Sequence, residues 1–231
     1  MNYRPNPVGT QPEYLHEAYQ STRKRSPLRP LVGLPPGCTE ASGPTFSPRH
    51  ATPIVDMFKT ADGREAVGQR IVVAGRVTDD DGRPVANTMI ELWQANAAGR
   101  YDHPGDVHDA PLDANFPGVG RVFTDEDGRY RFMSIKPGAY PWRNHFNAWR
   151  PNHIHFSLFG PGCASRLITQ MYFPGDPLLA LDPIYNSIPD VEARRRLVSI
   201  FDIDLTLPEY ALGYRFDLVL RGTHSTPFEG A

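Results

Sequence analysis

Two histidines that stand two residues apart, His153 and His155, are the residues of this chain best placed for chemistry. They lie in a segment that reads as a β-strand, in which alternate side chains share a face, so both imidazoles point the same way, about 6–7 Å apart. Ile154 and Phe156 then point into a core. Two imidazoles on one face can converge on one metal ion. A metal ion needs more ligands than two, and other parts of the chain have to supply them.

Two loop tyrosines offer oxygen ligands. Tyr101 stands in the string GRYDHPGD and Tyr140 in KPGAYPWRN. From these strings alone, each tyrosine reads equally well as a half-buried loop residue, and the histidine pair as packing residues or a zinc pair. Ionising a tyrosine at pH 7 costs about 4 kcal/mol, because its ordinary pKa is near 10. Two tyrosinates therefore need a hard Lewis acid such as Fe(III), whereas the nearby Asp102 and Asp106 keep a divalent zinc site open.

The surroundings of these four residues are similar to a known family. The strings ELWQANAAGRYDHPGD, KPGAYPWRN, WRPNHIHF, TQMYFPGDP and YRFDLVLRG resemble the intradiol ring-cleaving dioxygenases, and among them the β chains that act on protocatechuate. The resemblance runs from about residue 19 to residue 228. It implies a non-haem Fe(III) cofactor held by Tyr101, Tyr140, His153 and His155. It also implies cleavage of protocatechuate (3,4-dihydroxybenzoate) by O2 between its two hydroxyl-bearing carbons, giving 3-carboxy-cis,cis-muconate.

The same resemblance implies roles for single residues. Tyr140 is the tyrosinate that leaves when substrate binds, and Tyr101 is the one that stays. Arg150 faces the substrate ring, where a fixed cation stabilises negative charge during reaction with O2. Trp93 reads as a core residue without a chemical role. The residues expected to contact substrate are Tyr19, Trp142, Arg150, Gln170 and Ile184.

The elements that must position these residues are mostly short strands. Runs rich in β-branched and aromatic residues occupy residues 71–78, 88–93, 121–124, 129–133, 153–159, 167–173 and 214–221. Asp-Gly turns at 81–82 and 127–128 indicate hairpins, the second one joining 121–124 to 129–133. The pattern predicts an all-β fold, with a β-sandwich core and long active-site loops at 94–120 and 136–152. The few short helices expected lie near 14–22 and at 190–201.

Residues 1–50 are expected to form an extended, Pro-rich N-terminal arm, and residues 51–231 the β-sandwich catalytic domain. The arm holds nine of the 24 prolines, and polar Pro-rich segments do not form regular sheets or helices. A segment that cannot fold alone can order on a partner, so we expect the arm to wrap another chain. The family implies a homologous α chain in a larger αβ oligomer, in addition to a catechol substrate and O2.

Composition excludes some classes of function. A net charge of −2 and a pI near 6.4 predict neither nucleic-acid nor membrane binding. No apolar signal core is visible, which favours a cytoplasmic protein. Cys38 and Cys163 fit no zinc or CxxC pattern, and free thiols in a reducing compartment are the favoured interpretation, with a disulfide left open.

Three alternatives to a protocatechuate enzyme stay open. An intradiol dioxygenase for another substituted catechol fits the same motifs. A zinc-dependent hydrolase or lyase would use the His153 and His155 pair. A non-catalytic β-sandwich binding module would need neither histidine. The last two leave the paired tyrosines and the long matching strings unexplained, so the Fe(III) dioxygenase is favoured.

Overall fold

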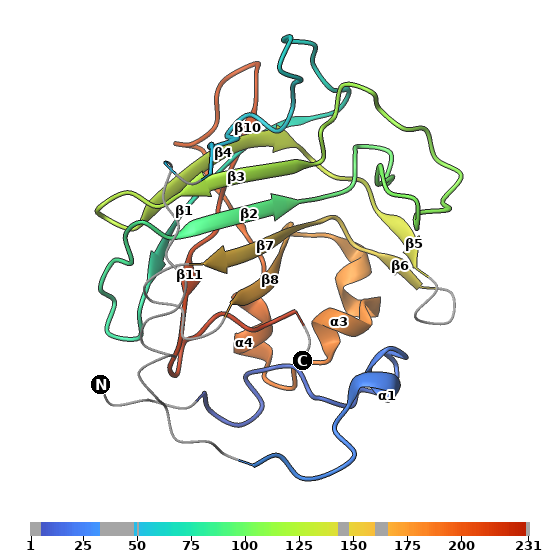
Figure 1. The fold of residues 1–231 in the computed structure, drawn as a ribbon, viewed down its shortest axis with the longest axis vertical. Coiled ribbons are helices and arrows are strands. Elements are labelled where there is room, and N and C mark those ends of the chain that lie inside the picture. The colour runs from blue at the N-terminus through green and yellow to red at the C-terminus, as the bar shows by residue number, and fades with distance from the viewer. Residues whose placement is uncertain (1–5, 33–48, 50, 143–147, 160–165, 230–231) are drawn as a thin grey trace.

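The computed structural model describes residues 6–32, 49, 51–142, 148–159 and 166–229. Two sheets stack face to face in a β-sandwich, with short helices and the N-terminal arm gathered along one side (Figure 1). This architecture confirms the predicted fold class. Among the described residues, no helix is long and apolar enough to cross a membrane.

The first sheet carries the histidine strand near its centre. Its four strands are antiparallel in the order β3-β2-β7-β8. Their bounds are Met89–Trp93 for β2, Val119–Phe123 for β3, His153–Phe159 for β7 and Leu167–Tyr172 for β8.

The second sheet is built around one long strand, β1. β4 pairs with β1 antiparallel, β10 and β11 pair with successive parts of it in parallel, and β9 extends the sheet beyond β10. The bounds are Arg70–Thr78 for β1, Arg129–Ile135 for β4, Ile200–Phe201 for β9, Leu212–Arg215 for β10 and Leu218–Val219 for β11. The predicted strand 214–221 is thus two short strands.

The core lies between the two sheets. On β7, Ile154, Phe156 and Leu158 are fully buried in it, as the alternation of the sequence predicted. They meet side chains of the opposite sheet, such as Val73 and Phe132. Each such side chain stabilises the fold by about 1.5–3 kcal/mol through burial. The other face of β7 is buried too, and there the histidines point.

The two Asp-Gly turns differ in what they close. The turn at Gly82 closes a short hairpin as predicted, because the Val85 N–H bonds the Val77 carbonyl at 2.9 Å and Thr78 pairs with Pro84 in an antiparallel bridge. The turn at Gly128 does not close the expected hairpin, since β3 lies in the first sheet and β4 in the second. Both glycines have positive φ values, as tight turns require. The prediction for Gly128 was wrong because a turn sequence fixes a local reversal but not the partner of the strand that follows.

The helices are shorter than expected. α4 spans Val191–Arg195 and begins as predicted, because the Asp190 side chain accepts a hydrogen bond from the Ala193 N–H. It ends early, since the Ser199 N–H bonds the Tyr172 carbonyl at the end of β8, 2.8 Å away. The helix expected near 14–22 forms later, as α1 at Thr22–Arg25. Two further short helices follow β8, η1 at Pro177–Leu181 and α3 at Pro183–Asn186.

The loop expected at 136–152 contains a small hairpin. β5, Tyr140–Trp142, pairs with β6, Ala148–Arg150, and sets Tyr140 directly opposite Arg150. Three-residue strands that include a proline give too short a pattern to be read from sequence. The hairpin places the second tyrosine and the arginine side by side.

The described part of the N-terminal arm packs against its own chain. The Glu13 N–H bonds the Ser187 carbonyl at 3.0 Å, and the Asp190 N–H bonds the Gly9 carbonyl at 2.9 Å. The arm therefore runs below α3 and α4, where Figure 1 shows it in blue. It reaches the site through Tyr19, which is buried.

Candidate metal centre

The histidine pair lies as the strand pattern predicted. The ring centroids of His153 and His155 are 4.8 Å apart, and both side chains are buried. On the neighbouring strand β8, Tyr172 stands opposite His153 and Gln170 opposite His155. Trp93, on β2, stacks its ring on His155 at 4.7 Å between centroids. Trp93 is only half-buried and lines a cavity, so its expected place in the core was wrong.

Each histidine is held through Nδ1 by an acceptor. The His153 Nδ1 lies 2.6 Å from the Pro151 carbonyl oxygen, and the His155 Nδ1 lies 2.8 Å from Oε2 of Glu229. Because both partners can only accept, each Nδ1 carries the proton, and in a neutral imidazole Nε2 is left as the free lone pair. Burial, reinforced by Arg150, holds the pKa of His153 well below its ordinary value, so this imidazole is neutral.

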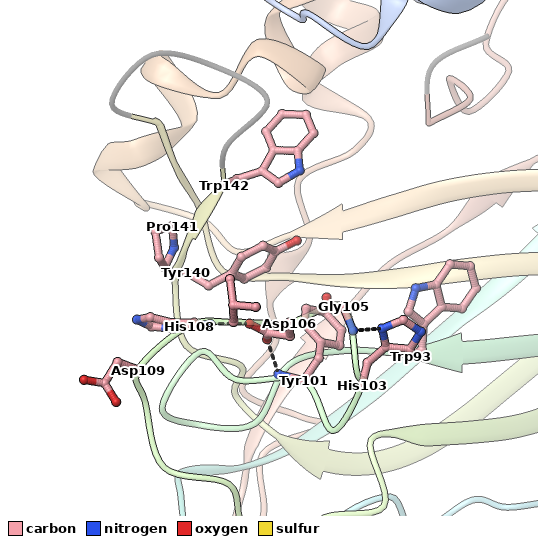
Figure 2. Close-up of a pocket in the computed structure, with 11 residues that line it drawn as sticks. Trp93, Tyr101, His103, Gly105, Asp106, His108, Asp109, Tyr140, Pro141 and Trp142 are labelled. Carbon is pink, nitrogen blue, oxygen red and sulfur yellow. Dashed lines mark hydrogen bonds between the residues drawn. The ribbon is translucent and has the colours of Figure 1, made fainter.

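The two tyrosines reach the same place from separate loops. The Tyr140 hydroxyl lies 3.4 Å from Nε2 of His153, and the rings of Tyr101 and Tyr140 meet edge to face at 5.4 Å (Figure 2). The Tyr101 hydroxyl is buried and has no hydrogen-bond partner among the described residues. A buried hydroxyl without a partner costs about 1–3 kcal/mol, so this oxygen is placed for a ligand.

Close backbone contacts hold the two tyrosine loops together. Gly99 has φ +76°, and a Cβ there would lie 2.0 Å from the Ala139 carbonyl oxygen. The Gly138 N–H bonds the Asn96 carbonyl at 2.9 Å. Only glycine allows this approach at Gly99, which comes two residues before Tyr101. The glycine contact therefore sets the distance between the two tyrosines.

The side chain of Asn96 organises the loop before Tyr101. Its Oδ1 accepts hydrogen bonds from the Ala98 and Arg100 N–H groups at 2.9 and 3.0 Å. The N–H of Tyr101 itself donates to Oδ2 of Asp106 at 2.8 Å. Asp106 therefore organises the loop, and each of its two oxygens accepts a hydrogen bond from a backbone N–H group.

Both site tyrosines are protonated in the metal-free protein. Burial raises the pKa of Tyr101 well above its ordinary value, and the neighbouring Tyr140 raises it further. Burial also raises the pKa of Tyr140, although the cation of Arg150 partly opposes the shift. Only a bound cation can make these oxygens anionic near neutral pH.

Arg150 is fixed by a buried polar network. Its Nε donates to Oδ1 of Asp182 at 2.9 Å, and both groups are almost fully buried. Its second terminal nitrogen contacts Gln170 and lies 3.3 Å from the Tyr172 hydroxyl. The guanidinium carbon stands 5.1 Å from the ring centroid of Trp142. Burial alone would lower the pKa of Arg150, but Asp182, Tyr172 and Tyr140 together raise it well above its ordinary value, so the group stays charged.

A cavity of about 680 Å³ opens beside the tyrosines. Trp93, Tyr101, Tyr140 and Trp142 line it, together with His108 and Asp109 from the loop that follows Tyr101 (Figure 2). Of the residues expected to contact substrate, Trp142 lines this cavity. Tyr19 lies behind it, with ring centroids 5.2 Å apart.

The remaining predicted residues lie at different depths. Arg150 and Gln170 form a buried row near the histidines, and Ile184 is buried in α3. His103 accepts a hydrogen bond from the Gly105 N–H, and Nδ1 of His108 lies 3.0 Å from the Gly99 carbonyl oxygen, so both hydrogen bonds stay within one loop. Cys38 and Cys163 lie outside the described residues.

Two residues of the site were missed from the sequence. Asp182 precedes a proline at a helix start, where it accepts a hydrogen bond from the Tyr185 N–H, so its sequence signal is that of a helix cap. Glu229 carries no local signal at all. It lies 74 residues from His155 and meets it only through the fold.

Comparison with known proteins adds a family to this geometry. A family model described as Dioxygenase matches residues 41–222, and a second, Protocatechuate 3,4-dioxygenase beta subunit N terminal, matches residues 3–37. The first match spans more than half of the chain. This chain is an intradiol dioxygenase family member.

Relatives of this intradiol dioxygenase include both kinds of chain of one enzyme. The Protocatechuate 3,4-dioxygenase beta chain of Burkholderia cepacia is 57% identical over 94% of this chain and 93% of its own length. The alpha chain from the same organism is 30% identical, covering 79% of this chain and 82% of its own. The solved 3-chlorocatechol 1,2-dioxygenase of Rhodococcus opacus 1CP is 25% identical with a TM-score of 0.54, covering 71% of this chain and 63% of that one.

The site of this intradiol dioxygenase fits the non-haem iron that the family uses. Two imidazoles, held through Nδ1, lie beside two phenols, and one of the phenol hydroxyls has no hydrogen-bond partner among the described residues. Hard anionic oxygen together with imidazole suits iron better than it suits a soft, thiolate-seeking metal. The donor set can therefore hold such an ion without rearranging the strand.

Proposed function

We propose that this chain is the iron-bearing β chain of a protocatechuate 3,4-dioxygenase. It cleaves protocatechuate with O2 between the two hydroxyl-bearing carbons and yields 3-carboxy-cis,cis-muconate. The identity of 57% to a beta chain of that name supports the substrate. The observation that carries the site is the buried Tyr101 hydroxyl, which lacks a partner beside Tyr140 and the histidine pair.

The proposed ligands of Fe(III) are Tyr101, Tyr140, His153 and His155. The ferric ion, when bound, supplies the positive charge that lets two buried phenols ionise near neutral pH and the Lewis acidity that activates a catechol. Nε2 of each histidine is the donor, because Nδ1 is already engaged. Two tyrosinates would balance two of the three positive charges of a bound ferric ion.

Tyr140 is the proposed base for the substrate. A catechol that bound as a dianion would release two protons, and the Tyr140 oxygen would take one of them while the other passed to solvent. Tyr140 suits this role because it lines the cavity and its pKa as a free phenol is raised. Tyr101, whose hydroxyl is buried, is proposed to stay in place.

Arg150 and Trp142 are the proposed substrate-side residues. The guanidinium is held by Asp182 and Gln170, so its charge is fixed before substrate arrives, which is the condition for electrostatic stabilisation of a charged transition state. Trp142 offers a ring face beside the cavity, and Tyr19 supports that ring. Gln170 and Ile184 are proposed to complete the pocket.

A zinc hydrolase is the weaker reading. Among the described residues, one group of His, Cys, Asp or Glu side chains is close enough for a shared metal ion, at Asp79, Asp80 and Asp81, and it does not include the histidine pair. A zinc site at His153 and His155 would therefore lack a third ligand of the usual kind.

A homologous α chain is the proposed partner, in a larger αβ oligomer, because this chain resembles both chains of the Burkholderia cepacia enzyme. We also propose that the arm, residues 1–50, contacts that partner beyond its contacts with its own chain, and that the protein is cytoplasmic. Limited proteolysis with and without the partner tests the arm, and cell fractionation tests the location.

The deciding experiment is a panel of substituted catechols, assayed with the co-purifying partner retained. We expect the intradiol product from protocatechuate at a higher kcat/KM than from catechol, chlorocatechol or hydroxyquinol. The purified protein should be red-brown, and anaerobic substrate should shift its absorption band. A colourless protein that holds iron, or stoichiometric zinc without iron, would overturn the proposal.

A further inference from the structure

Glu229 contacts a histidine of the proposed iron site although it lies outside the sequence strings that carry that site. Its Oε2 lies 2.8 Å from Nδ1 of His155. Only 19% of its side chain is exposed, and 9% of that of His155. The other histidine, His153, has a neutral backbone carbonyl at the same position. The two imidazoles therefore differ in the charge behind them.

Backbone and side-chain bonds fix the segment that carries Glu229 to the edge of β8. The Glu229 N–H donates to the Ile168 carbonyl at 2.8 Å. Two residues earlier, the Pro227 carbonyl accepts from the Thr169 hydroxyl at 2.7 Å. The carboxylate thus approaches His155 from a strand-like segment and not from a free tail.

The N-terminal arm holds the same segment from its other side. Gln11 accepts a hydrogen bond from the Phe228 N–H at 2.9 Å and donates one to the Ser225 hydroxyl at 3.2 Å. Ser225 in turn donates to Asn6 at 2.9 Å. Gln11 of the arm therefore hydrogen-bonds both Ser225 and Phe228, on the segment that carries Glu229.

A carboxylate at this position has two physical effects on a ligand histidine. It fixes the tautomer, because it accepts only and so keeps the proton on Nδ1 and the lone pair on Nε2. It also makes the imidazole a more basic ligand, which a backbone carbonyl does less strongly. Both effects require the carboxylate to stay within hydrogen-bond distance.

We propose that Glu229 is a positioning residue for His155, and that Gln11 of the N-terminal arm holds it in place. The proposal rests on the proposed function, in which His155 binds iron. Through this contact the arm acts on the metal site of its own chain. A carboxylate that supports one histidine and a carbonyl that supports the other give the site two ligands of unequal basicity.

The test compares Glu229→Ala and Glu229→Gln in the complex with the partner retained. Loss of an outer partner of a metal ligand typically weakens metal binding about 10–100-fold. We expect the iron of Glu229→Ala to be lost to a chelator faster by a factor in that range. Glu229→Gln, which can still accept from Nδ1 but carries no charge, should recover part of the loss.

Glu192→Gln is the matched control. Glu192 also bonds a basic side chain, Arg195, but both are exposed on α4 and far from His155 in the chain. It makes the same change of charge and should leave iron release unchanged. Wild-type rates of iron release in both Glu229 variants would overturn the proposal.

A second readout does not depend on iron. In the metal-free complex with ¹⁵N-labelled histidine, solid-state NMR should show His155 protonated at Nδ1, and Glu229→Ala should abolish that preference. Gln11→Ala leaves the carboxylate of Glu229 but removes the two hydrogen bonds that Gln11 makes to its segment, so it should weaken the preference for the proton on Nδ1 in part. An unchanged tautomer would refute the positioning role. A wild-type complex that holds no iron would instead refute the proposed function, and the tautomer would still decide the role of Glu229.

Discussion

The two halves of the site are built by different means. The strand half, His153 and His155, lies on the central strand of a sheet, and both imidazoles have fixed acceptors behind them. The loop half consists of Tyr101 and Tyr140, which lie on two separate segments. Those segments contact each other through the backbone, at Gly99 and Ala139 and at Gly138 and Asn96. The strand donors are therefore ready before metal arrives. The loop donors are protonated phenols, and one of them has no partner.

The difference shows which half depends on the ion. A neutral histidine with a free Nε2 needs no change to bind a metal. A buried tyrosine must lose its proton, which burial opposes. We infer that the loop half supplies both the charge balance and the exchangeable ligand, while the strand half supplies a fixed frame.

The largest expected effect breaks the loop half at its deeper residue. Tyr101→Phe should abolish stable iron binding and activity, because the ligand that stays is gone. The metal-free protein should nevertheless be as stable as wild type or more so, by up to about 1–3 kcal/mol, since a buried hydroxyl without a partner is removed. Metal analysis and chemical denaturation measure the two outcomes.

His155→Ala is the counterpart in the strand half. It should also lose iron, but here the metal-free protein should be less stable, because Glu229 is left buried without its partner. If Tyr101→Phe destabilised the metal-free protein as much as His155→Ala, the contrast between the two halves would fail.

A smaller effect is expected from the exchangeable ligand. Tyr140→Phe should keep iron but lose a base for substrate, and general base catalysis contributes about 10²–10⁴-fold in rate. Stopped-flow absorbance under anaerobic conditions measures the rate of catechol binding. An unchanged rate would show that Tyr140 is not displaced.

The loop contact itself can be tested with a pair of glycines. Gly99→Ala places a methyl group against the Ala139 carbonyl, whereas Gly82→Ala has open space at nearly the same φ. A left-handed residue other than glycine costs about 1–2 kcal/mol. We expect that loss for Gly82→Ala and a larger one for Gly99→Ala, together with reduced iron content. If both variants lost the same stability, the close contact between Gly99 and Ala139 would not be needed to hold the two tyrosine loops together.

The smallest effect comes from a buried tyrosine outside the site. Burial raises the pKa of Tyr130 well above its ordinary value, and its hydroxyl donates to the Phe216 carbonyl. The unfolded chain ionises near pH 10 while the folded chain does not, so stability falls above pH 10 by up to about 1.4 kcal/mol per pH unit. Tyr130→Phe should flatten this slope and lower stability at pH 7.

The control for this slope is Tyr14→Phe, a substitution of an exposed tyrosine. It should leave both the slope and the stability at pH 7 as in wild type. Unfolding in denaturant at pH 7 to 11 measures all three proteins. A slope that Tyr130→Phe leaves unchanged would remove Tyr130 as its source.

The histidine strand could be predicted because its information is local. Because His153 and His155 alternate with Ile154, the sequence predicts which face of the strand meets the core. Asp190 likewise predicts where a helix begins, since it is a typical N-cap residue. The partner of a strand after an Asp-Gly turn depends on which sheet it joins, and that is decided by packing. The loop tyrosines were found through the resemblance to a family, because loops have no repeating hydrophobic pattern from which a side chain's direction can be predicted.

Glu229 could not be predicted because nothing near it in the sequence refers to His155. Their contact exists only after β8 pairs with β7 and the segment at 225–229 lies along β8. The sequence around Asp182 predicts only a helix cap, so it gave no reason to expect the ion pair of Asp182 with Arg150. When a residue's local role already accounts for its place in the sequence, the sequence does not indicate that it also contacts a residue far away in the chain.

The bond between Gln11 and Phe228 spans 217 residues, nearly the whole chain. During synthesis, the strand with His153 and His155 and both tyrosine loops leave the ribosome before Glu229 does. Contacts this far apart in the sequence form late, because closing a long loop costs entropy before any contact offsets it. On the proposed assignment, a nascent chain would therefore display its iron ligands before the support of His155 exists, and tight iron binding would have to wait until the chain is finished.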